Sequence, residues 1–150
     1  MSLKKYIVST LIVKGDGEMF VKSLEDIIGT KDDVAAGNWR SRRFISAHDR
    51  LGFSMNDTTI KAGTKNFFWY KNHIEAVYVI EGEGEIEQLD TGDVFQLKPG
   101  TMYVLNENDK HEVRTRTDMR MVCVFNPPLV GTETHDEDGI YPLLTLDDVE

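Results

Sequence analysis

The stretch between residues 73 and 111 contains side chains of the types that bind a metal ion. Glu75 and His111 supply a carboxylate oxygen and an imidazole nitrogen, whereas a catalytic metal site commonly takes about three protein ligands and keeps one position open. Tyr103 is one candidate for the third ligand, because strand alternation can point its phenol inward and a cation would help to ionise it. His73 is the other candidate, because it shares a strand face with Glu75 two residues on. These side chains together predict a metal site. The alternative is that Tyr103 is a core residue and His111 a loop residue, with no metal bound.

A second cluster lies near the end of the chain. Glu133 and His135 are two residues apart, so both side chains can face one pocket and serve proton transfer or hold an amine. The acidic residues 136–138 that follow are typical of a solvated turn. The pair, and not the acidic run, is the candidate functional element.

A basic group in an otherwise acidic chain is the third candidate. Arg40, Arg42 and Arg43 follow Trp39. One arginine can bind a substrate carboxylate through two parallel hydrogen bonds while the indole covers an apolar part of the ligand. Salt bridges on the surface are the commoner role of such arginines. Residues 82–84, Gly-Glu-Gly, predict a hairpin and not a nucleotide loop, since no helix pattern follows them.

The elements that must position these residues are short and separated by turns rich in glycine. They predict an all-β fold, a small barrel of the jelly-roll type. One short helix is expected over 23–29, with Ser23 as its cap and Gly29 at its end, placed to plug one end of the barrel. The strands are predicted at Arg42–Ala47, Gly52–Ile60, Phe67–Tyr70, Glu75–Glu81, Glu83–Leu89, Asp93–Leu97, Met102–Leu105, Glu112–Thr115 and Met119–Phe125.

Length and charge limit the classes of protein that remain. A chain of 150 residues predicts one domain, here residues 19–142, after an N-terminal extension (1–18) and before an acidic tail (143–150). The extension holds a β-branched run, 6–13, that can form an edge strand, and it begins with residues typical of an expression remnant. The net charge of −9 argues against nucleic acid and anionic membranes as partners. The single cysteine, Cys123, reads as a buried strand residue and favours a reducing, cytoplasmic location.

Two spaced motifs resemble those of the cupins, a superfamily of small β-barrels. The first motif, Gly-x5-His-x-His-x3-Glu-x6-Gly, fits at Gly63, Trp69, Lys71, Glu75 and Gly82, so both histidine positions are substituted and the glutamate is kept. The second motif, Gly-x5-Pro-x-Gly-x2-His-x3-Asn, fits at Gly100, Asn106, Asn108, His111 and Thr115, so only its first glycine and its histidine are kept. Because both motifs occur in the right order, they predict a cupin-type barrel.

Residues 19–142 further resemble the ectoine synthase family of the cupin superfamily. The segments that carry the resemblance are 19–29, 38–43, 70–85, 99–103, 123–128 and 131–142. The resemblance implies a homodimeric enzyme that cyclises N-γ-acetyl-L-2,4-diaminobutyrate, a small molecule derived from an amino acid, to ectoine with loss of water. It implies iron(II), or another divalent transition metal, on Glu75, Tyr103 and His111. It places substrate contacts at Trp39, Arg43, Asn56, Thr58, Phe125 and Glu133, and catalytic groups at Tyr70, His73, Glu133 and His135.

The chain departs from the family pattern at a few positions. Trp69 stands where the family commonly has histidine, Val79 where it often has cysteine, and Asn106 and Asn108 where Asp-x-His is usual. Two other functions are compatible with the same barrel: a non-catalytic cupin that binds a zwitterionic solute, and an iron-dependent oxygenase.

Overall fold

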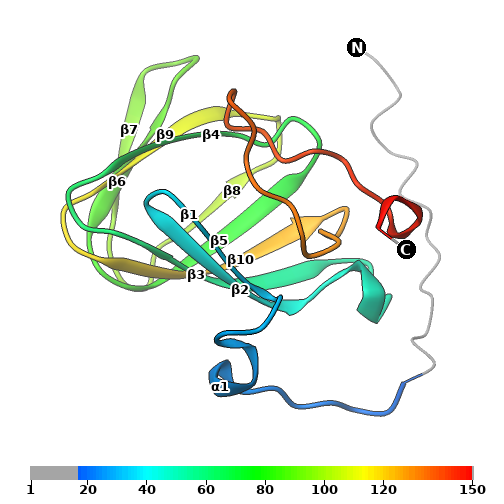
Figure 1. Ribbon diagram of the computed structural model, residues 1–150. Helices are drawn as coiled ribbons and strands as arrows, with labels where there is room; N and C mark the ends of the chain where they lie inside the picture. Colours follow the sequence, from blue (N-terminus) through cyan, green and yellow to red (C-terminus); the bar gives the residue numbers. More distant parts are fainter. Residues whose placement is uncertain (1–16, 150) are drawn as a thin grey trace.

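Two antiparallel β-sheets face each other in the computed structural model, which describes residues 17–149 (Figure 1). The larger sheet has the strand order β1-β2-β3-β10-β5-β8, and the smaller has the order β4-β9-β6-β7. The strands of the larger sheet are β1 (Asp33–Ala36), β2 (Trp39–Ile45), β3 (Ser54–Ile60), β10 (Met119–Asn126), β5 (Ile74–Glu81) and β8 (Met102–Leu105). Those of the smaller sheet are β4 (Lys65–Trp69), β9 (Lys110–Thr115), β6 (Gly84–Gln88) and β7 (Asp93–Leu97).

Strand β10 shows how the sequence builds the core. Its residues alternate between buried and partly exposed along the whole strand, so Met119, Met121, Cys123 and Phe125 all point inward. The strand pairs with β3 on one side and β5 on the other. Its inward side chains therefore lie in the middle of the larger sheet, and the prediction that Cys123 is buried is confirmed.

All nine predicted strands are present, with shifts of a few residues at their ends, but strand β1 was not predicted. Its sequence, Asp-Val-Ala-Ala, has little β propensity. It forms because Gly37 and Asn38 make a two-residue turn, with a φ of 58° at Gly37, that folds it onto β2.

The predicted helix is present but does not close the barrel. Helix α1 spans Leu24–Ile27, and the Ser23 amide donates to the Asp26 carboxylate at 2.6 Å in a capping box. It packs beside β2, and Figure 1 shows it below the larger sheet. The expectation that it plugs the barrel is therefore wrong. In the described part of the chain, no helix is long and apolar enough to cross a bilayer.

The segment after β10 covers the cavity between the sheets instead. The Leu129 amide donates to the Ser54 hydroxyl at 3.0 Å, which joins the segment to the larger sheet. The Trp69 amide donates to the Gly139 carbonyl at 2.8 Å, which joins it to β4 of the smaller sheet. Residues 127–142 therefore bridge both sheets. In its described residues, 143–149, the predicted tail contains one 3-10 turn, η3 (Leu146–Asp148). The predicted extension, apart from its last two residues, lies outside the described residues.

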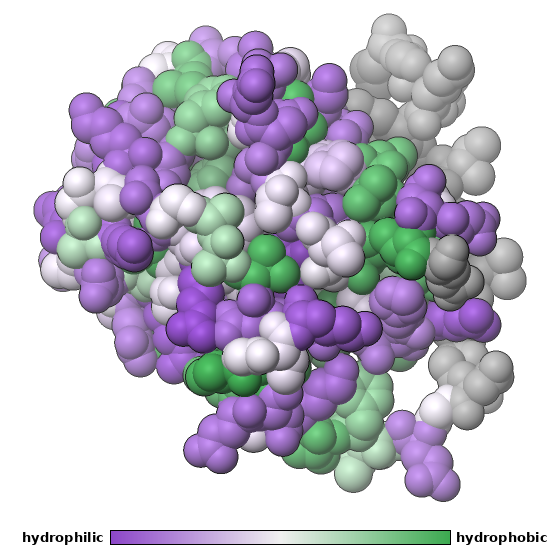
Figure 2. Space-filling model, in the orientation of Figure 1, coloured by the Kyte–Doolittle hydropathy of each residue, from purple (hydrophilic) through white to green (hydrophobic). Residues whose placement is uncertain are grey.

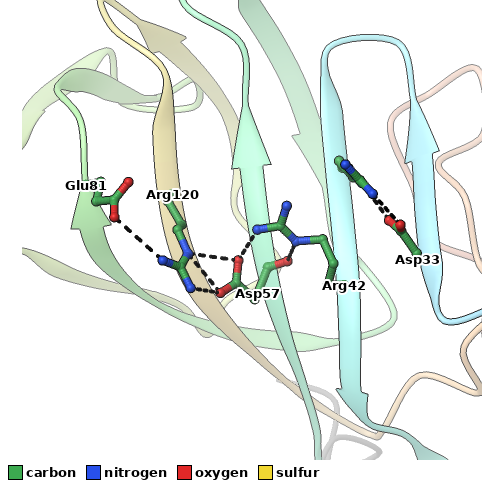
Figure 3. A network of polar contacts seen from close by, with 6 residues as sticks. Asp33, Arg42, Asp57, Glu81 and Arg120 are labelled. Carbon is green, nitrogen blue, oxygen red and sulfur yellow. Dashed lines mark hydrogen bonds and ion pairs between the residues drawn. The ribbon is translucent and has the colours of Figure 1, made fainter. Parts of the chain in front are cut away.

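A network of ion pairs crosses the outer face of the larger sheet (Figure 3). Asp57 of β3 lies between Arg42 of β2 and Arg120 of β10, and Arg120 donates to it at 2.6 Å. Glu81 of β5 extends the network, 3.6 Å from Arg120. Burial acts to raise the pKa of Asp57, but hydrogen bonds from Arg120 and Arg42 outweigh it and hold the pKa below its ordinary value. Hydrophilic residues also cover much of the face seen in Figure 2.

We expect Asp57→Asn to lower the free energy of unfolding by about 3 kcal/mol, because it leaves the buried Arg42 guanidinium without a counter-charge. Urea denaturation at neutral pH measures this. Glu81→Gln is the control, since Glu81 is exposed and its loss should cost no more than about 1 kcal/mol. Asp57 has a lowered pKa in the folded state, so its contribution should be complete above its ordinary pKa. The difference between wild type and Asp57→Asn should shrink as the pH falls below about 4, and a difference that does not change with pH would contradict the assignment.

Candidate active site

The candidate active site is a cavity enclosed by the two sheets and the segment after β10. Cross-strand register explains why distant residues meet there. Arg43, Asn56, Cys123, Val77 and Tyr103 form one row across β2, β3, β10, β5 and β8. The cavity is lined mainly by aromatic and apolar side chains with a few polar ones, namely Trp39, Asn56, Thr58, Ile60, Phe68, Tyr70, Glu75, Tyr103, Met121, Cys123, Phe125, His135 and Tyr141.

Two of the three predicted metal ligands line this cavity from the larger sheet. Glu75 is 4% exposed, and burial raises its pKa to about 8, although the Cys123 thiol lies within hydrogen-bonding reach. Burial and the nearby Glu75 carboxylate raise the pKa of Tyr103 well above its ordinary value. No ion pair to Glu75 is present among the described residues. Glu75 is thus a buried carboxyl group that a cation would stabilise in its charged form.

The third, His111, lies opposite on β9 of the smaller sheet, beside the rings of Phe68 and Tyr70. Its Nδ1 donates to the Asp109 carbonyl oxygen at 3.0 Å, because a carbonyl can only accept. Its Nε2 is buried and meets no hydrogen-bond partner within residues 17–149. Burial lowers the pKa of His111 to about 4, so Nε2 carries a free lone pair at neutral pH. Metal-binding histidines commonly have this arrangement.

His73, the other candidate third ligand, is buried elsewhere. Its ring lies edge-on to Phe125 and Tyr141, with centroids 5.9 and 6.4 Å away, and, like His111, it is not among the residues that line the cavity. In the part of the chain that the structure describes, no three His, Cys, Asp or Glu side chains converge as a metal site. A three-ligand set here thus needs a residue of another type, and Tyr103 has a suitable oxygen.

A tyrosine and a histidine form the hydrogen-bonded pair in the cavity. The Tyr70 hydroxyl and His135 Nε2 are 2.8 Å apart, and the edge of the Trp39 ring lies against His135 at 5.1 Å. Burial and the Arg43 charge lower the pKa of His135 to about 3. Its Nδ1 is buried with no hydrogen-bond partner among the described residues. A neutral imidazole has one N–H donor and one nitrogen with a free lone pair, so His135 can hydrogen-bond a ligand through Nδ1 while Nε2 contacts Tyr70.

Glu133 and Arg43 are buried together behind the cavity wall. Arg43 Nη1 lies 3.5 Å from Glu133 Oε2, and the two Glu133 carboxylate oxygens accept the amides of Val130 at 2.6 Å and Gly131 at 2.9 Å. Neither side chain lines the cavity. Apart from this ion pair of Nη1, Arg43 Nε and Nη1 have no hydrogen-bond partner in the described chain. The acidic run 136–138 that follows is exposed, as expected for a solvated turn.

Four of the five predicted substrate contacts on the larger sheet come together at the cavity, Arg43 being the exception. Trp39, Asn56, Thr58 and Phe125 all line the cavity, and Asn56 Oδ1 is buried without a hydrogen-bond partner in residues 17–149. Tyr141 was missed. It lines the same cavity, and its only signal in the sequence was its place two residues after Gly139 in a segment that carries the family resemblance.

Two of the departures from the family pattern contact each other at the end of β4. Trp69 Nε1 donates to the Asn108 carbonyl at 3.1 Å, and the Asn108 side chain donates to the Tyr70 carbonyl at 3.1 Å. Lys110 covers the Trp69 ring at 4.3 Å. Val79, a third departure, is a fully buried core residue. The substitutions thus support the backbone of Tyr70 and the core without entering the ligand set.

Comparison with known proteins finds similar sequences and structures. The family model described as ectoine synthase matches residues 19–145. The chain is 71% identical to L-ectoine synthase of Oceanobacillus iheyensis, over 84% of this chain and 98% of that protein. It is 73% identical to L-ectoine synthase of Virgibacillus pantothenticus, over 85% and 99%. The solved structure of ectoine synthase from P. lautus matches with a TM-score of 0.76 at 59% identity, over 84% of this chain and 91% of that one. A cupin protein from Desulfovibrio desulfuricans, at 24% identity and a TM-score of 0.51 over 61% and 85%, shares the fold alone.

Proposed function

The chain belongs to the ectoine synthase family, a family of hydro-lyases of cupin fold, and its function is ectoine synthesis; we propose that it closes N-γ-acetyl-L-2,4-diaminobutyrate into ectoine with the help of a divalent iron ion. In this reaction the α-amine nitrogen forms a bond to the acetamide carbon of the same molecule. The carbonyl oxygen then leaves as water, and a C=N bond completes the cyclic amidine.

Glu75, Tyr103 and His111 are the residues that would hold the metal. The observation that carries this assignment is His111, whose Nε2 is buried, neutral and unpartnered within the described chain while Nδ1 is fixed by a backbone carbonyl. The buried, unpaired Glu75 carboxyl supplies the negative charge that a cation requires. A bound divalent iron would act as a Lewis acid that polarises a carbonyl oxygen.

The chain's own residues have the task of holding the substrate folded. Arg43 lies outside the cavity lining but 5.9 Å from the ring of Tyr141, which is part of it, and its donors without hydrogen-bond partners would suit the substrate carboxylate, since a guanidinium and a carboxylate match in shape and charge. Trp39 and Phe125 wall the cavity with apolar surface. Their rings exclude bulk water, which favours condensation over hydrolysis of the amide. Closing the ring within one bound molecule also removes most of the entropic cost of bringing amine and carbonyl together.

We assign proton transfer to the hydrogen-bonded pair of Tyr70 and His135. The amine must lose protons and the departing oxygen must gain them, and the hydrogen bond of 2.8 Å between the two side chains lets a proton pass from one to the other. Burial lowers the pKa of His135, so its neutral imidazole is a weak base, and its role would be to relay a proton: one ring nitrogen takes up a proton as the other gives one up. Glu133 remains a predicted base. Its hydrogen bonds to two amides and its contact with Arg43 support a second role, which is to hold Arg43 in place.

Mass spectrometry of the iron-loaded protein, incubated without oxygen with N-γ-acetyl-diaminobutyrate, tests the function. We expect a product lighter than the substrate by one water, without a redox partner. Binding with no conversion across several divalent metals would favour a solute-binding cupin. A requirement for oxygen would favour an oxygenase.

We also propose that the protein is a homodimer that pairs along strand β8. This strand is an edge of the larger sheet and, within residues 17–149, pairs only with β5. It exposes Met102 (60%) and Val104, and the neighbouring edge strand β7 exposes Phe95 (56%). An uncovered apolar edge of this kind invites a second chain.

Replacing Met102 and Phe95 together by glutamate should convert the dimer into a monomer, because the two introduced carboxylates would be buried without partners in the interface along β8. Light scattering at working concentrations measures the mass. Phe53→Glu is the control, since Phe53 is exposed away from these strands. A monomeric wild type, or a dimer that survives the double substitution, would contradict the assignment.

A further inference from the structure

We propose that Tyr141 is a positioning residue for the reaction: the face of its ring holds the His135 imidazole in the orientation that brings Nε2 to the Tyr70 hydroxyl. The inference rests on the proposed role of His135 in proton transfer. It concerns a residue that lines the cavity but belongs to neither the ligand set nor the predicted substrate contacts.

The ring geometry around His135 supports this assignment. The Tyr141 ring stacks on the imidazole with centroids 4.0 Å apart and an interplanar angle of 14°. Phe68 is tilted by 37° at 4.7 Å, and Trp39 is perpendicular at 5.1 Å. Among the ring contacts of His135 in the described chain, that of Tyr141 is therefore the closest and the most nearly parallel. A parallel neighbour restricts rotation of the imidazole about χ2, whereas an edge contact restricts it less.

A tight turn fixes the pair from the backbone side. The Asp136 amide donates to the Ile140 carbonyl at 2.9 Å, and the Asp136 carboxylate accepts the Ile140 amide at 3.0 Å. His135 and Tyr141 flank this turn and lie side by side for that reason. Gly139 has a φ of +75° and sits against β4, where an added Cβ would lie 2.8 Å from the Phe67 ring. The turn therefore requires glycine and holds the stacked pair over the cavity.

Tyr141 also contacts two other groups of the site. Its ring stacks on Tyr70 with centroids 5.2 Å apart, and the Arg43 guanidinium lies 5.9 Å from its centroid. Tyr141 thus contacts both members of the proton-transfer pair and the arginine assigned to the substrate. Burial raises the pKa of its hydroxyl, so the hydroxyl stays protonated, while the ring is the part that stacks on His135.

Steady-state kinetics of the iron-loaded dimer with Tyr141→Phe, Tyr141→Leu, His135→Ala and the double variant His135→Ala/Tyr141→Leu test the inference. Tyr141→Phe keeps the ring and should retain kcat within about threefold, whereas Tyr141→Leu should lower kcat by about 30-fold with little change in KM. In the double variant the loss should equal that of His135→Ala alone, because residues that act as a unit are not additive. Tyr141→Met, which fills the space with a flexible chain, replaces Tyr141→Leu if the latter fails to fold.

Three results would overturn the inference. Equal losses in Tyr141→Phe and Tyr141→Leu would assign the effect to the hydroxyl. Additive losses in the double variant would show that Tyr141 acts independently of His135. A loss in Tyr141→Leu that appears in KM alone would make the residue a substrate contact. Full activity of His135→Ala is a distinct result, since it would remove the proposed role of His135 itself.

Discussion

Tyr103→Phe should purify with little iron, and its turnover should fall by more than about 100-fold. Loss of a group that only hydrogen-bonds to a metal ligand lowers activity by roughly 10–100-fold, so a larger loss is expected for a ligand itself. The substitution removes one oxygen and keeps the ring, which packs against the core. The melting temperature of the metal-free protein should therefore change little. Iron content per chain, turnover and thermal unfolding, measured on the same preparations, provide the comparison.

Variants of the other two proposed ligands and of His73 are the matched set for this prediction. Glu75→Ala and His111→Ala should also lose iron. His73→Ala should keep more of it while still losing activity, because His73 is buried against Phe125 and Tyr141 and, among the described residues, forms no three-ligand group with Glu75 and His111. If Tyr103 were a core residue with a hydrogen-bonded hydroxyl, Tyr103→Phe would keep its iron and lose only about 1 kcal/mol of stability. Full iron occupancy in Tyr103→Phe would remove Tyr103 from the ligand set.

Glu133→Gln should lower the free energy of unfolding by about 3–5 kcal/mol and abolish activity, because it leaves the Arg43 charge buried without its partner. It also places an amide group where a carboxylate now accepts the amides of Val130 and Gly131. Residues 127–142 should then detach from the larger sheet. Urea denaturation and protease sensitivity of this segment measure the effect.

Two further variants separate the structural role of Glu133 from a role in proton transfer. Glu137→Gln, in the exposed turn, should be silent. Replacing Glu133 by leucine and Arg43 by methionine together should recover stability relative to Glu133→Gln, since no buried charge remains, but should stay inactive without the arginine. Normal stability of Glu133→Gln with full loss of activity would instead support the predicted general base.

Much of this site followed from the sequence, because a strand has a side-chain period of two. Glu75, Tyr103 and Cys123 occupy positions whose alternation points them inward, and the structure places all three on the cavity. The turn residues between the strands are local signals too, so nearly every strand was predicted. The types of side chain also limited the chemistry, since a carboxylate, a phenol and an imidazole suit a transition metal.

The tertiary structure decided which residues meet across long separations. Arg42 and Arg43 are neighbours in the chain, yet only sheet pairing places Arg42 in the outer network with Asp57 and Arg43 beside Glu133 inside. The stacking of Tyr141 on His135 depends on a turn that must fit against β4, which no local pattern encodes. Local propensity acts over a few residues, whereas the partner of a buried charge or ring is selected by packing and by desolvation, and both depend on the whole fold.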